Sequence, residues 1–136
     1  MPSVTVTNTL LANRAAALRS LVNADSFGCL YVNAATITPE TVLGDLMLAT
    51  FPGYAAINLV GLWGAAFKLD QGVWITVCPT QTFNCTGASA QLVHGAGIYS
   101  SLGLLGILPA SAPIALHAGL AIPVQFSLLD VAAVLF

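Results

Sequence analysis

The residues of this chain best suited to bind a metal or attack a substrate are three cysteines and two histidines: Cys29, Cys78, Cys85, His94 and His117. Thiolates and imidazoles are the ligands that zinc prefers, but no C-x-x-C pair is present and no cysteine–histidine spacing matches a zinc motif. We therefore expect the thiols to be buried as small apolar side chains. A Cys78–Cys85 disulfide, which would close a short loop and leave Cys29 unpaired, stays an open alternative.

Catalytic motifs are equally sparse. The HGAG sequence at residues 94–97 superficially resembles an oxyanion-hole loop, but no G-x-S-x-G nucleophile motif accompanies it. We therefore predict a tight strand turn at these residues. The chain has no P-loop and no G-x-G-x-x-G motif. Its carboxylates are dispersed and form no close pair in sequence: Asp25, Glu40, Asp45, Asp70 and Asp130. We predict that the protein is not an enzyme and uses no cofactor, metal or small-molecule substrate.

The composition says more than the motifs about the surface. Only 6% of the residues are charged and 57% are hydrophobic, and the formal net charge is −2. Soluble domains typically carry about 25% charged residues. Three basic side chains are too few to neutralise a run of phosphates, so nucleic acid is excluded as a partner. We infer that much of the folded surface is buried against lipid or against other protein subunits.

Lipid is the weaker of these two options. The most apolar stretch, residues 101–126, is long enough to span a bilayer, but three prolines and a histidine interrupt it. No lysine or arginine flanks it as an anchor. The first residues, MPSVTVTNTLLANR, lack the order of regions found in a secretory signal. We therefore expect protein partners and no membrane association. A membrane-associated protein is kept as a third hypothesis, after two virion roles that are described below.

The pattern along the chain predicts one domain, residues 1–136, of mainly β structure with an N-terminal helix. Residues 8–23 form the helix, because apolar residues recur at helical spacing and Thr7 or Asn8 can cap its start. Residues 26–129 form a β-rich body and residues 130–136 a C-terminal tail. Strands are predicted at residues 26–32, 54–63, 72–78, 89–100 and 120–129, with a helical turn within 41–47. This density of strands and turns is typical of an antiparallel β-sandwich or small barrel.

A tight turn is predicted at Phe51, Pro52, Gly53 and Tyr54. Proline supplies the fixed φ of the second position of a type II turn, and glycine supplies the positive φ of the third. Phe51 and Tyr54 would anchor the turn on the core or on an interface, and we favour the core.

The order of these motifs resembles a family of small tailed-bacteriophage virion proteins. The resemblance lies in LYVN (residues 30–33), TPET (38–41), GD (44–45) and ATFPGY (49–54), and it extends to ITVCPTQTFNCTG (75–87) and GLAIPVQFSLL (119–129). Family members show acidic residues before the turn, whereas this chain has Leu46, Met47 and Leu48. The sharpest shared motif is ATFPGY.

The resemblance implies a structural virion protein, and specifically a capsid decoration, or cement, protein of β-sandwich type. Such proteins are often homotrimers that bind the major capsid protein, and this one would be made in the cytoplasm of a bacterial host and reside on the capsid surface. Intracellular assembly disfavours the disulfide. The family brings no catalytic residues. The alternative is a phage tail or receptor-binding β-sandwich module, in which Trp63 and Trp74 would form a carbohydrate-binding platform.

Surplus hydrophobicity marks the expected assembly interface. Residues 102–109 and 113–120 carry more apolar side chains than one core requires. The interface residues predicted from these segments are Leu102, Leu104, Leu105, Ile107, Leu108, Pro109, Ile114 and Leu116.

Overall fold

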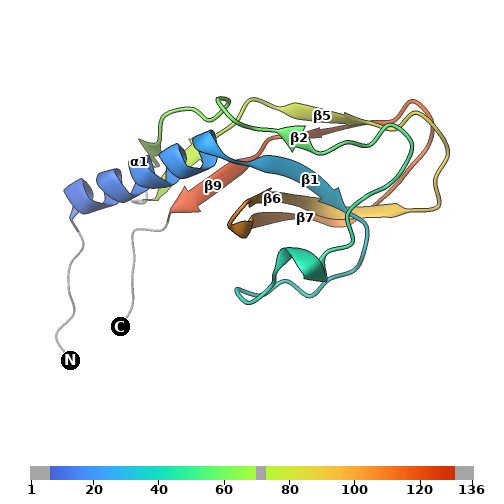
Figure 1. The fold of residues 1–136 in the computed structure, drawn as a ribbon, viewed down its shortest axis with the longest axis horizontal. Coiled ribbons are helices and arrows are strands. Elements are labelled where there is room, and N and C mark those ends of the chain that lie inside the picture. Colours follow the sequence, from blue (N-terminus) through green and yellow to red (C-terminus); the bar gives the residue numbers. More distant parts are fainter. Residues whose placement is uncertain (1–6, 70–72, 131–136) are drawn as a thin grey trace.

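The computed structural model describes residues 7–69 and 73–130, which form one long helix followed by strands of very different lengths (Figure 1). The helix is α1 (Asn8–Ala24), and a short 3-10 helix, η1 (Leu43–Asp45), interrupts the strands. The strands are β1 (Phe27–Tyr31), β2 (Ile57–Asn58), β3 (Phe67–Lys68), β4 (Trp74–Val77), β5 (Gln81–Asn84), β6 (Leu92–Ser100), β7 (Gly103–Ala115), β8 (Ala121–Val124) and β9 (Ser127–Asp130).

Helix α1 confirms the prediction for residues 8–23 and ends one residue later. Thr7 is the N-cap, and its side chain accepts a hydrogen bond from the backbone N–H of Leu10 (3.5 Å). The predicted apolar stripe is turned inward, with Leu11, Ala15 and Val22 buried. The helix packs against β4.

The strands confirm a mainly-β fold of sandwich type and form open sheets rather than a closed barrel. One sheet has the order β2-β1-β6-β7, a second has β3-β4-β9, and β5 pairs with β8. Every pairing is antiparallel. The β6–β7 pairing is the longest and contains two irregularities in register. Strand β7 therefore lies at one edge of the four-stranded sheet, and β6 lies inside it.

Two predicted strands were wrong in extent. Residues 54–63 pair only at Ile57–Asn58. Gly61 has a φ of 79°, and the chain beyond it runs beside α1. Residues 120–129 break after Val124 into β8 and β9, which belong to different sheets. The predicted strand at 72–78 is β4, and its first residue lies outside the described residues.

Strands β3, β5 and β7 were not predicted. In β5 only Phe83 is buried among polar neighbours, so its apolar signal is weak. Strand β7 contains Pro109 and Pro113, which are usual arguments against a strand. Both are tolerated because an edge strand has one side on which no backbone N–H is needed.

Of two minor predictions, the helical turn is confirmed and the start of the C-terminal tail is wrong. The helical turn expected within residues 41–47 is η1. The tail predicted at 130–136 starts too early, because Asp130 still pairs with Trp74 in the β4–β9 ladder. Residues 131–136 lie outside the described residues.

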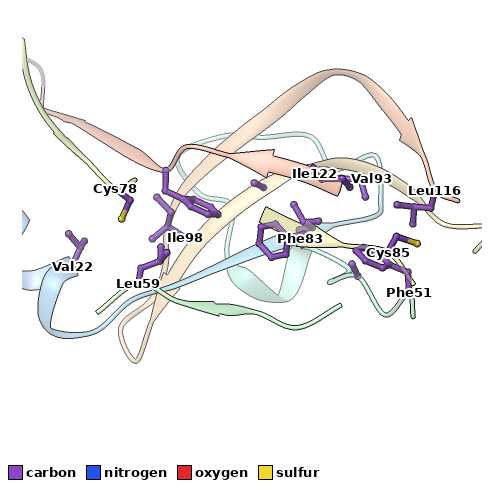
Figure 2. Packing of buried hydrophobic residues seen from close by; sticks show 14 of the residues in the cluster. Val22, Phe51, Leu59, Cys78, Phe83, Cys85, Val93, Ile98, Leu116 and Ile122 are labelled. Atoms are coloured by element: carbon purple, nitrogen blue, oxygen red, sulfur yellow. The ribbon is translucent and has the colours of Figure 1, made fainter. Parts of the chain in front are cut away.

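The core is a continuous row of apolar side chains between the sheets. Figure 2 shows it running from Val22 and Cys78 at one end to Phe51 and Leu116 at the other. Aromatic rings occupy its centre, where Phe83 lies 5.8 Å from Tyr54 and 6.4 Å from Phe126 between ring centroids. These rings join β5 to the segments before β2 and after β8, so the core holds distant parts of the chain together.

Candidate assembly surfaces

The three cysteines are buried and unbridged, as the spacing predicted. Burial raises the pKa of Cys29 and of Cys78 to about 11, so both remain protonated thiols at neutral pH. The Cys85 thiol donates to the carbonyl oxygen of Gly87 (3.0 Å). These side chains pack as small hydrophobes, and the alternative of a Cys78–Cys85 disulfide is wrong.

The HGAG sequence lies within β6, so the predicted tight turn at residues 94–97 is also wrong. A Cβ atom on Gly95 would lie 2.6 Å from the Tyr31 hydroxyl, and one on Gly97 would lie 3.2 Å from the Cys29 sulfur. The glycines therefore let β1 side chains lie directly over β6. Their role here is packing. In the described part of the chain, no cluster of histidine, cysteine and carboxylate side chains could hold a metal ion.

The turn at Phe51, Pro52, Gly53 and Tyr54 has the predicted geometry. Gly53 has a φ of 87°, and the N–H of Tyr54 donates to the carbonyl oxygen of Phe51 (3.0 Å). Phe51 is buried in the core. The Tyr54 hydroxyl accepts a hydrogen bond from the N–H of Leu30 (3.3 Å), and burial raises its pKa to about 12. Both aromatic residues thus lie on the core side of the turn.

Most of the residues predicted for the assembly interface fall on β7 or its ends. Leu116 is buried, and Leu105, Leu108 and Ile114 are partly buried against the core. Among the residues that the structure describes, Leu102 is the most exposed large apolar side chain, at 70%, and it lies on the turn between β6 and β7. The remaining members, Leu104, Ile107 and Pro109, are half-buried or exposed. The predicted set is therefore mixed, with some members engaged in the core and others available at the surface.

A first exposed apolar surface lies on the loop between β1 and β2. We call it the loop surface and define it by Ile37, Val42 and Met47, of which Met47 is 60% exposed. Beside it is a hollow of about 390 Å³ lined by residues 37–39, Thr41 and residues 104–107 of β7. The half-buried side chains of β7 thus adjoin the loop surface.

A second exposed apolar surface lies on α1 and the segment that runs beside it. We call it the helix surface; its members are Leu10, Leu21, Val60, Leu62, Phe67 and Leu69. Leu10 and Leu21 are eleven positions apart, about three helical turns, so they share one face of α1. Neither surface was predicted, because hydrophobic density along the sequence does not reveal which side chains the fold leaves uncovered.

The segment beside α1 is fixed by hydrogen bonds along the length of the helix. The N–H of Gly61 donates to the carbonyl oxygen of Asn23 (3.1 Å). The Arg19 guanidinium donates to the carbonyl oxygen of Trp63 (2.8 Å). At the other end, the Lys68 ammonium donates to the side-chain oxygen of Asn8 (3.2 Å). Residues 61–68 therefore run antiparallel to α1 on the side of the helix that carries Asn8 and Arg19, whereas Leu10 and Leu21 lie on the opposite side of the helix.

The tryptophans do not form an exposed platform together. Trp63 is buried, and its indole N–H donates to the Ser26 hydroxyl (2.9 Å), while Trp74 is half-buried in β4. Trp63 presents no ring face to solvent. The carbohydrate platform expected for a receptor-binding module is therefore not built from this pair.

Comparison with protein-family models, with curated proteins and with solved structures found no match. Among the residues that the structure describes, no helix is both long enough and apolar enough to cross a membrane.

Proposed function

We propose that this chain is a structural virion protein of a tailed phage, a capsid decoration protein that bridges subunits of the major capsid protein. The observation that carries the proposal is the combination of a continuous apolar core with large apolar side chains that remain exposed outside it. Side chains such as Val42, Met47 and Phe67 are not needed to complete the core. Apolar surface of this kind is typical of contacts between proteins.

The near absence of charge supports the same role. A free monomer gains solubility from charged side chains, and this chain has eight such residues in 136. A decoration protein is covered by its own copies and by capsid subunits, and interface centres are depleted of charge. Its action needs no catalysis, cofactor or nucleic acid. Binding only the assembled shell stabilises that state by the free energy of binding, repeated at every site on the lattice.

The test uses virions of the phage that encodes this chain, separated into heads and tails. The proposal expects the protein in the head fraction, with a ratio of its copies to capsid subunits that stays constant from one preparation to the next. Shells stripped of the protein should lose heat resistance and regain it when the purified protein is added back. Recovery in the tail fraction would support the receptor-binding alternative instead, and absence from both fractions would reject a virion role.

A further inference from the structure

Strand β7 has a backbone edge that no described strand pairs with. In the sheet order β2-β1-β6-β7 it is the last strand, with β6 on one side only. With 13 residues it is the longest of the described strands, whereas β2, at the opposite edge of the same sheet, has 2. An unpaired edge presents a row of backbone N–H and C=O groups and can template the addition of another strand.

The contacts with β6 show which residues of β7 face this free edge. Backbone groups along an antiparallel strand point alternately toward the paired neighbour and away from it. The carbonyl oxygens of Gly106 and Leu108 lie against β6, 3.5 Å and 2.6 Å from where Cβ atoms on Gly97 and Gly95 would lie. The residue between them, Ile107, therefore points its N–H and C=O away from β6.

The two halves of β7 differ in the protection of this edge. Proteins block exposed edges with prolines, charges or a covering segment. The second half contains Pro109 and Pro113, which have no N–H to offer to a partner. The first half, GLLGIL at residues 103–108, contains neither a proline nor a charge. Its one irregularity in register lies at Leu105, so the ladder with β6 is regular from Gly106 onward. Strand addition is therefore open to the first half.

The loop between β1 and β2 leaves this edge uncovered. Residues 104–107 line the hollow of about 390 Å³, whose other wall is residues 37–39 and Thr41 of the loop that carries η1 (Figure 1). Side chains of successive strand residues point to opposite faces, so the feature that four consecutive residues share is their backbone edge. The loop is bonded within itself, because the N–H of Thr38 donates to the Thr41 hydroxyl (2.9 Å) and the N–H of Thr41 to the carbonyl oxygen of Thr38 (3.0 Å). The hollow is thus an open groove along β7.

The groove has room for the backbone of an added strand. A paired strand lies about 4.8 Å away and extends about 3.4 Å per residue, so four residues need a strip of about 14 Å by 5 Å. A volume of about 390 Å³ gives that strip a depth of roughly 5–6 Å. A peptide backbone fits this depth, because its side chains project above and below the sheet.

We propose that the groove receives β7 of a second copy of this chain, antiparallel to the first. The occupant must be extended, must have an unpaired edge of its own and must be uncharged, since no residue that lines the groove is ionisable. Residues 103–108 of every copy meet all three requirements. The side chains of Leu104 and Ile107, half-exposed in one copy, would lie beside those of the other.

The same strand takes part on both sides, so the contact is isologous and gives a dimer. It joins two four-stranded sheets into one continuous sheet. A dimer differs from the homotrimer that the resemblance implies, and the inference does not rest on the proposed function. The competing occupant is an extended segment of a different protein, and in that case the purified chain would stay monomeric.

The experiment removes one backbone N–H from the free edge. Ile107→Pro takes away the N–H that faces the second copy and keeps the hydrogen bonds with β6, which use the residues on either side. Ile107→Val is the matched control, because valine keeps the N–H and suits a strand. Native mass spectrometry over a range of concentrations reads the mass of each protein. We expect a dimer for the wild type and for Ile107→Val and a monomer for Ile107→Pro, with circular dichroism to check the fold.

Amide hydrogen exchange of the wild type tests the same contact without a substitution, and it decides alone if Ile107→Pro does not fold. The Ile107 amide should exchange at least about tenfold more slowly at concentrations where the dimer forms than at high dilution. The amide of Gly106, which faces β6, is the internal reference and should be protected at both concentrations.

Four results would overturn the proposal. They are a wild type that is monomeric at every concentration, a folded Ile107→Pro that still dimerises, a monomeric Ile107→Val, and an Ile107 amide that stays unprotected in the oligomer.

Discussion

Strands β6 and β7 are neighbours in one sheet, yet the strand with the larger apolar side chains, β7, is the less buried of the two. Strand β6 (LVHGAGIYS) has glycine and alanine at its centre and is almost entirely buried from Val93 to Ser100. Strand β7 (GLLGILPASAPIA) is rich in leucine and isoleucine, and no residue of it is fully buried. The difference lies in position, because β6 is covered by strands on both sides and β7 is paired on one. Hydrophobicity of a segment is thus a poor measure of its burial.

Truncating a core side chain of β6 should have the largest effect. Ile98 is fully buried, so Ile98→Ala removes buried methylene groups and leaves a cavity, at a cost of about 2–5 kcal/mol in the free energy of unfolding. The matched change in β7, Ile107→Ala, should cost on the order of 1 kcal/mol because that side chain is half-exposed. Urea unfolding of dilute protein measures both. Equal losses at the two positions would break the contrast between the strands.

Enlarging a central glycine of β6 should be the next most damaging change. Gly95→Ala places a Cβ atom 2.6 Å from both the carbonyl oxygen of Leu108 and the Tyr31 hydroxyl. The resulting displacement should cost about 1–3 kcal/mol. Gly44→Ala is the control, because no atom lies within 4 Å of its new Cβ, and we expect a change within about 0.5 kcal/mol. Thermal unfolding distinguishes the two variants. An unchanged unfolding temperature for Gly95→Ala would show that β6 can accommodate a Cβ atom at this position.

Alkaline pH should destabilise the protein through two buried thiols, of which Cys29 pairs with Gly97 of β6. Cys29 has an ordinary pKa of 9.0 that burial raises to about 11, and Cys78 behaves alike. Above pH 9 the unfolded chain loses these protons while the folded chain keeps them, so the unfolding free energy stays level up to about pH 9 and falls between pH 9 and 11. Cys29→Ala should flatten that decline when unfolding is followed across the range. An unchanged slope would mean that Cys29 is not in a dry environment.

The smallest effect is expected at the turn between β6 and β7. Leu102 is 70% exposed, so Leu102→Ser should change the unfolding free energy by no more than about 0.5 kcal/mol. Urea unfolding under the conditions used for Ile98→Ala makes the two values comparable. A loss of several kcal/mol would show that Leu102 makes a buried contact and that the start of β7 contributes to core packing.

Local patterns predicted the local structure. The apolar spacing of residues 8–23 gave α1 and its buried stripe, and Pro52-Gly53 gave the turn, because both depend on residues close in sequence. The spacing of the cysteines correctly indicated buried, unpaired thiols. The split of residues 120–129 into β8 and β9 had no local signal, since β8 pairs with β5 and β9 pairs with β4.

The predicted assembly residues show the same limit. Leu105, Leu108 and Leu116 were grouped with Leu102 on hydrophobicity alone, but the fold turns the first three toward the core and leaves Leu102 in solvent. The exposed surfaces on α1 and on the loop consist of scattered residues such as Leu10, which no sequence run singles out.

The sequence by itself determined the class of fold, the helix, the turn and the shortage of charge, because propensity, spacing and composition act locally or in total. The tertiary structure decided which apolar residues form the core, which lie on an edge strand and which stay exposed. Those outcomes depend on the order of strands in each sheet and on the packing of α1. Both arise from contacts between residues far apart in the chain.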